Sequence, residues 1–204
     1  MSLDSGADDK RSRLIRAGQE LLHQQGFQRS TLADVAGRAG VPLGNVYYYF
    51  KTKDSLCEAI VEAHASALQQ HFEALEKEKQ PKERLRALIR GPRASLEAIL
   101  AYGCPHGSLC QELEKLGPGS PLAQAGARLM DLYVTWAEAQ FRALGCPRAR
   151  DLAVDLVASL QGAILLAHTF RSPTLLEQSL RRLERGLSDL AADTRSSRTR
   201  KKTS

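Results

Sequence analysis

The sequence predicts an all-α fold, with a three-helix helix-turn-helix domain at the N-terminus followed by a larger helical domain. Apolar residues recur at steps of three and four along most of the chain, which is the period of an amphipathic helix. Hydrophobic residues make up 43% of the chain but aromatic residues only 5%, and this composition is typical of helices rather than of β-sandwiches. Glycine and proline stand at the ends of the apolar segments, where helices start and stop.

The N-terminal segment is predicted to open with a helix from about Asp9 to Gln25. Gly26 follows it and is placed to take the left-handed conformation of a C-cap. Thr31 and Asp34 have the spacing of a capping box, which opens a second, short helix that runs through Ala39. These signals divide the first forty residues into two helices and a turn.

A glycine-containing turn separates the second helix from a third. Gly40 is expected to end the second helix, because a sharp turn there requires a positive φ. Pro42 suits the first turn of the next helix, which is predicted to end near Tyr49. Thr52 is expected to cap a fourth helix that begins at Lys53.

The rest of the chain is predicted to form longer helices. They are expected over residues 53–80, 82–102 with a break at Gly91-Pro92, 108–116, 121–144, 148–171 and 173–192. The last of them carries leucines at alternating steps of four and three, a narrow seam that requires a partner helix. These leucines are Leu176, Leu180, Leu183, Leu187 and Leu190.

The net charge of +6 is unevenly distributed along the chain. Basic residues outnumber acidic ones in residues 1–53 and again in 195–202, whereas the segment between them is slightly acidic. We therefore expect a DNA-binding domain over residues 1–52, a ligand-binding and dimerisation domain over 53–194, and a disordered basic tail over 195–204.

Two short helices joined by a glycine turn are the arrangement that helix-turn-helix recognition of DNA requires. Asn45 can donate and accept hydrogen bonds at base edges, the hydroxyls of Tyr47 and Tyr48 can bind phosphates, and residues at helix N-termini favour a phosphate. The predicted DNA-contacting residues are Thr31, Leu43, Gly44, Asn45, Tyr47, Tyr48 and Lys53.

Residues 10–60 resemble the DNA-binding domain of the TetR family. The resemblance rests on Gly26-Phe27, on Thr31-Leu32-Ala33-Asp34-Val35-Ala36, and on the run from Gly44 to Leu56. Pro42 and Leu43 depart from the serine and basic residues often found there. The resemblance implies a homodimer on a near-palindromic double-stranded operator, and repression that a small-molecule effector relieves by entering the C-terminal domain.

The sequence of the C-terminal domain indicates its function less specifically than that of the N-terminal segment. Residues 102–113 resemble a Gly-Cys-x-x-Gly-x-Leu-x-x-Glu stretch of some TetR proteins, of which some respond to electrophiles through the cysteine at the position of Cys104 and others bind flavonoid-like molecules. A thiol sensor acting through Cys104, and a DNA-binding regulator without an effector, are therefore alternatives to a ligand-released repressor. The candidate ligand-binding residues are Leu96, Tyr102, Cys104, Met130, Tyr133, Trp136 and His168.

Other classes of protein receive little support from the sequence. A phosphate-binding glycine loop and a nucleophile elbow are missing, so no enzyme and no cofactor are expected. Cys104, His106, Cys110 and Glu112 lack the spacing of a metal site, and no metal is expected. Four cysteines without an export signal are expected to be free thiols. We expect a cytoplasmic protein with no membrane segment, because polar residues interrupt its most apolar stretch, residues 153–170.

Overall fold

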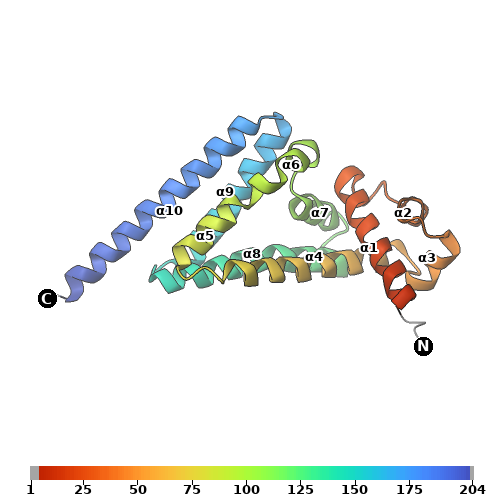
Figure 1. Cartoon of the computed structure of the whole chain (residues 1–204), viewed down its shortest axis with the longest axis horizontal. Coiled ribbons are helices and arrows are strands. Elements are labelled where there is room, and N and C mark those ends of the chain that lie inside the picture. The colour runs from red at the N-terminus through yellow and green to blue at the C-terminus, as the bar shows by residue number, and fades with distance from the viewer. Residues whose placement is uncertain (1–4, 203–204) are drawn as a thin grey trace. The chain divides into compact units, whose positions relative to one another are not determined.

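The computed structural model describes the backbone of residues 5–202 and the side chains of residues 9–190, and the described chain is helical throughout (Figure 1). The all-α prediction is confirmed. The elements are α1 (Ser5–Gln25), α2 (Leu32–Ala39), α3 (Leu43–Tyr49), α4 (Lys53–Leu75), α5 (Pro81–Arg90), the 3-10 helix η1 (Gly91–Ser95), α6 (Leu96–Tyr102), α7 (Pro105–Glu114), α8 (Pro121–Leu144), α9 (Ala149–Thr169) and α10 (Pro173–Lys202).

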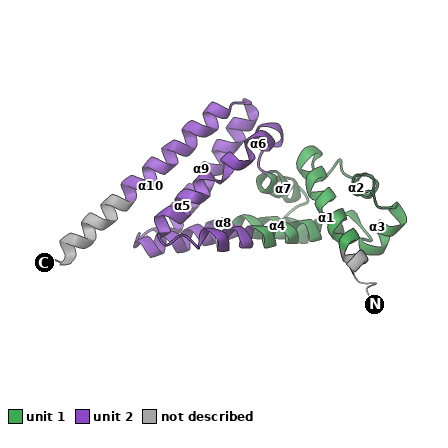
Figure 2. Cartoon of the chain, in the orientation of Figure 1, with its two compact units in different colours: residues 1–67, 105–130 green, residues 68–104, 131–204 purple. Residues whose placement is uncertain are grey.

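The chain forms two compact units (Figure 2). Unit 1 comprises residues 1–67 and 105–130, and unit 2 comprises residues 68–104 and 131–204. Unit 1 thus contains α1 to α3, the first part of α4, all of α7 and the start of α8. The sequence prediction had divided the chain after residue 52. The predicted basic tail, residues 195–204, lies outside the residues whose side chains are described.

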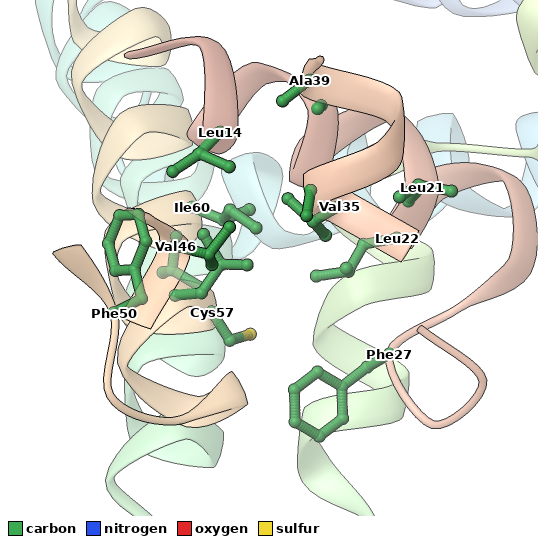
Figure 3. Packing of buried hydrophobic residues seen from close by; sticks show 14 of the residues in the cluster. Leu14, Leu21, Leu22, Phe27, Val35, Ala39, Val46, Phe50, Cys57 and Ile60 are labelled. Atoms are coloured by element: carbon green, nitrogen blue, oxygen red, sulfur yellow. The ribbon is translucent and has the colours of Figure 1, made fainter. Parts of the chain in front are cut away.

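Unit 1 is built around one apolar core to which the short helices and α7 all contribute. Figure 3 shows Leu14, Val46 and Ile60 converging from α1, α3 and α4. All three side chains are fully buried. The remaining buried members are Ala17, Leu21, Leu22, Phe27, Val35, Ala36, Ala39, Val41, Phe50, Leu56, Cys57, Val61, Leu109, Leu113 and Leu122.

Several predicted helix boundaries are wrong, including the end of the last helix, which lies at Lys202 and not near residue 192. The fourth helix ends at Leu75 rather than near residue 80, because the charged segment 76–80 forms turns, and Pro81 opens α5 instead of stopping α4. Proline lacks a backbone N–H, which the first turn of a helix does not need. For the same reason α7 begins at Pro105 and not at residue 108.

The predicted break at Gly91-Pro92 is confirmed as the 3-10 helix η1. Pro92 removes a donor from the helical ladder, so the chain tightens into the 3-10 form. In unit 2 the guanidinium of Arg93 binds the carboxylates of Glu177 and Glu184, each at 2.8 Å. Hydrogen bonds from Arg93, which has the larger effect, and from Arg181 lower the pKa of Glu177 to about 2. These ion pairs connect η1 to α10.

Within unit 2, the leucine seam of α10 faces helices of its own chain. Leu176, Leu180 and Leu187 are buried, and α10 packs against α9 and α5. A different apolar surface lies open on and just after α9, where four side chains are 46 to 64% exposed: Val154, Leu165, Leu166 and Phe170. Among the described residues, α9 is the one helix long and apolar enough to cross a membrane, and 39% of its most apolar stretch is buried within the structure.

Two histidines join α4 to α7 in unit 1. The Nε2 of His106 lies 3.2 Å from the Nδ1 of His64, the distance of a hydrogen bond between two rings. Burial lowers the pKa of His64 to about 4 and that of His106 to about 3, with the neighbouring His23 contributing to both shifts. Both rings are therefore neutral at pH 7.

This depression of the two pKa values predicts a loss of stability in acid. Below pH 6.5 the unfolded chain takes up protons that the folded chain does not, so the free energy of unfolding falls as the pH falls towards 4. Each histidine contributes on the order of 1 kcal/mol per pH unit in this range and nothing above it. Urea unfolding between pH 8 and pH 5 measures the slope.

The variant His106→Gln is expected to reduce that slope. His71→Gln changes an exposed histidine of the same long helix α4 and serves as the control. An unchanged slope in His106→Gln would show that the pair does not set the acid sensitivity.

Candidate nucleic-acid interface

Short polar contacts fix both ends of α2. Thr31 Oγ1 accepts a hydrogen bond from the Asp34 N–H at 3.1 Å, and Asp34 Oδ2 accepts one from the Thr31 N–H at 2.9 Å. The predicted capping box is thus confirmed, and the Thr31 hydrogen bonds lower the pKa of Asp34. At the other end, Gly40 has a φ of 61° and ends the helix in the left-handed conformation, as predicted.

An arginine of α1 holds the turn between α2 and α3. The guanidinium of Arg13 donates hydrogen bonds to the carbonyl oxygens of Ala39 and Gly40. This contact could not be predicted from the sequence, because α1 carries several basic residues and the partners are backbone atoms. The contact keeps the two short helices in register with α1.

One side of α3 is buried and the other is open. Val46 is fully buried, whereas Leu43, Tyr47 and Tyr48 are 41%, 49% and 75% exposed. Gly44 is also exposed and Asn45 is half-buried. The structure therefore brings five of the predicted DNA-contacting residues together on one seven-residue helix.

The other two predicted DNA-contacting residues are already engaged within unit 1. The hydroxyl of Thr31 belongs to the capping box. The Nζ of Lys53 donates to the carbonyl oxygens of Phe27 at 3.0 Å and Gln28 at 3.4 Å, and it lies 4.3 Å from the centre of the Phe27 ring. The Lys53 ammonium thus braces the turn between α1 and α2.

Further basic side chains lie close to α3 in unit 1. The guanidinium of Arg11 stands 5.5 Å from the centre of the Phe50 ring, directly after α3, and Lys51 is exposed beside it in the sequence. Cations at the rim of an exposed recognition helix are suited to phosphates. Neither residue was among the predicted contacts.

The predicted ligand-binding residues do not gather at one place. In unit 2, Trp136 stacks on Phe72 with ring centres 4.8 Å apart, and its Nε1 donates to Glu76 at 3.0 Å. Tyr133 meets the same Phe72 ring edge-on at 5.6 Å. These two candidates are therefore part of an aromatic cluster centred on Phe72, which the sequence reasoning missed.

The remaining candidates in unit 2 lie on or next to α6 and on α9, two helices that pack against each other. Met130 belongs to unit 1. In unit 2 the Cys104 thiol lies 3.6 Å from the Gln161 amide nitrogen, His168 Nδ1 lies 3.1 Å from the Leu100 carbonyl oxygen, and Tyr102 is 40% exposed. Leu96 is half-buried at the start of α6.

Two surface grooves of unit 2 are lined by other residues, mostly charged. One is bounded by Glu78, Glu83, Ala87, Arg90, Gly91 and Ala94. The other is bounded by Arg86, Arg90, Arg181, Glu184, Arg185, Ser188 and Asp189. Over the part of the chain that the structure describes, no group of three or more metal-ligating side chains is placed to hold a metal ion.

Comparisons with known proteins agree with a DNA-binding surface. A family model for bacterial regulatory proteins of the tetR family matches residues 14–60. The HTH-type transcriptional regulator Rv0196 of Mycobacterium tuberculosis is 31% identical over 183 residues, which cover 85% of this chain and 91% of that protein. The HTH-type transcriptional repressor DhaR of Mycobacterium sp. strain GP1 is 28% identical over 183 residues, covering 83% and 88%.

A solved structure shows the same likeness. The regulatory protein TetR from Rhodobacter sphaeroides matches with a TM-score of 0.74 at 26% identity, over 85% of this chain and 96% of that one.

Proposed function

This chain belongs to the TetR family of bacterial regulatory proteins, and we propose that it is a homodimeric repressor that a small molecule releases from a near-palindromic operator. The observation that carries the proposal is α3, whose Val46 is buried in the core while Tyr47 and Tyr48 stand open. A helix anchored on one side with its polar groups free on the other is suited to a major groove.

The exposed side of α3 carries two kinds of group, those that can position the protein on the DNA backbone and those that can recognise bases. The hydroxyls of Tyr47 and Tyr48 can donate to phosphate oxygens, which fixes the register on the duplex but carries no sequence information. The amide of Asn45 can pair with the N6 and N7 of an adenine, and Gly44 has open space around it. The repressor role is supported by the name of the similar protein DhaR.

The division predicts different outcomes for two substitutions. Asn45→Ala is expected to reduce the discrimination between bases by about 1–3 kcal/mol. Tyr48→Phe is expected to lower the affinity for all DNA sequences to a similar extent. The measurement is binding to a duplex that the wild-type protein selects from a random library, and to its single-base variants. Tyr133→Phe, a tyrosine of unit 2, is the control.

If the wild-type protein selects no duplex, the proposal that the chain is a DNA-binding repressor is wrong. Equal affinity and equal discrimination in wild type, Asn45→Ala and Tyr48→Phe would contradict only the assignment of α3 as the reading helix.

The dimer interface is proposed on the open side of α9. Val154, Leu165, Leu166 and Phe170 form apolar surface that the described chain does not cover, and exposed apolar surface of this kind marks an interaction site. A second copy related by a two-fold axis would cover it, and the two α3 helices of a DNA-bound dimer must stand about 34–36 Å apart, or a multiple of that spacing, to enter successive major grooves.

Leu165→Glu is expected to convert the dimer to a monomer, because it places a charge in the proposed apolar contact. Sedimentation equilibrium at micromolar concentration measures the change. Gln111→Glu adds the same charge at an exposed position of α7 and is expected to remain dimeric. A wild-type chain that sediments as a monomer, or a dimer that Leu165→Glu leaves intact, would refute this interface.

One observation favours a thiol as the point of control. The helix α7 begins at Pro105, so Cys104 directly precedes its N-terminus, and its thiol is only half-buried. The Gln161 amide, at 3.6 Å from the sulfur, is placed to donate a hydrogen bond to it. By contrast, burial raises the pKa of Cys57 to about 12.

A thiol-reactive electrophile is therefore expected to lower the affinity of wild type for the selected duplex, and to have no effect on Cys104→Ser. Cys110→Ser is the control, because that thiol donates to the Gly126 carbonyl within unit 1. If the electrophile leaves the wild-type affinity unchanged, the thiol-sensor alternative is wrong and regulation by a reversibly bound ligand is favoured. If a small-molecule screen also finds no response, an effector-free regulator is favoured.

A further inference from the structure

The turn between α1 and α2, residues 26–30, is the point from which the two short helices extend. Gly26 has a φ of 85°, and its carbonyl accepts a hydrogen bond from the Ser30 hydroxyl at 2.8 Å. The Gln25 amide donates to the same hydroxyl at 3.3 Å. Ser30 is fully buried and directly precedes the Thr31 cap of α2, so the conformation of this turn sets where α2 begins.

A carboxylate from a distant helix closes this turn. Glu112 of α7 accepts a hydrogen bond from the backbone N–H of Phe27, 85 residues earlier in the sequence. A Cβ at Gly26 would meet the same carboxylate and displace it from the turn, and the φ of 85° independently favours glycine at this position. Hydrogen bonds with an ionised partner are about twice as strong as neutral ones.

The opposite side of the same residue is held by a cation. Lys53 donates to the carbonyl oxygens of Phe27 and Gln28 and lies against the Phe27 ring. Phe27 thus has its N–H on a carboxylate of α7 and its carbonyl on an ammonium of α4. Two charges of opposite sign fix one peptide segment from both sides.

The helix that carries Glu112 is anchored in unit 1. This helix places Leu109 and Leu113 in the core of unit 1, and His106 contacts His64 of α4. Because the backbone of α7 is anchored by these core contacts, the hydrogen bond from the Phe27 N–H to Glu112 links the position of α7 to the turn. The function proposed above does not use this residue, although it ends the Gly-Cys stretch noted in the sequence.

We propose that Glu112 is a positioning residue for DNA binding: through the Phe27 N–H it fixes the turn that orients α2 and α3, and so α7 sets whether unit 1 is ready to bind DNA. The inference rests on the proposed function as a DNA-binding repressor. It identifies α7 as the element through which an effector acts, because a small shift of α7 withdraws the carboxylate from the turn.

The test compares three variants of the full-length chain. Glu112→Ala removes the acceptor and is expected to weaken binding of the selected duplex about tenfold, the effect of losing a hydrogen bond to a charged group. Glu112→Gln keeps an acceptor oxygen without the charge and is expected to give an intermediate loss. Glu114→Ala removes an exposed carboxylate of the same helix and should leave the affinity unchanged.

A second measurement separates positioning from general stability. Amide hydrogen exchange over residues 26–31 is expected to accelerate in Glu112→Ala. Leu122→Val, which thins the same core on α8, should lower the urea midpoint without changing either exchange at the turn or DNA affinity. Circular dichroism confirms that each variant is folded.

The outcomes distinguish a failure of the proposed repressor function from a failure of the proposed role of Glu112. If the wild-type chain selects no duplex, both the proposed repressor function and this inference are overturned. A wild-type chain that binds DNA while Glu112→Ala binds equally well overturns the inference alone. Equal weakening in Glu112→Ala and Leu122→Val would assign Glu112 a structural role and would also overturn it.

Discussion

The apolar core of unit 1 is the constraint on which the DNA-binding surface depends. Helices shorter than about 12–15 residues are marginal in water, and α2 and α3 have only eight and seven residues. They persist because Val35 and Val46 are buried against Leu14 and Ile60 of the longer helices. Burial of one face of α3 is also what forces its other face outward, so the same packing that stabilises the helix exposes the groups that we propose to meet DNA.

The signals that act within a few residues were predictable from the sequence. The capping box of Thr31, the left-handed Gly40 and the Thr52 cap at the start of α4 each depend on neighbours at most four residues away. The HTH helices were therefore predicted closely. Pro81 was misread because proline stops one helix and starts the next with equal readiness, and only the charged residues before it decide that α4 has already ended.

The contacts that act over long sequence separations were not predictable. Arg13 meets carbonyl oxygens 26 and 27 residues away, and Glu112 meets a backbone N–H 85 residues away. Neither partner offers a side chain that a pattern could identify. Helical periodicity likewise placed Trp136 and Tyr133 on a helix but not against Phe72, because it gives the face of a helix without saying what that face meets.

The packing of α7 restricts how a signal reaches the DNA-binding surface. Leu109 and Leu113 are buried in the core of unit 1. Burial of each of these side chains stabilises the packing of α7 on the core by about 1.5–3 kcal/mol. Pulling α7 off the core would require an effector to prefer the released state by roughly a hundred- to ten-thousand-fold. Withdrawing one carboxylate from the Phe27 N–H requires only about tenfold. On the proposed mechanism, an effector of ordinary affinity would therefore shift α7 slightly along the core and not pull it away from the core.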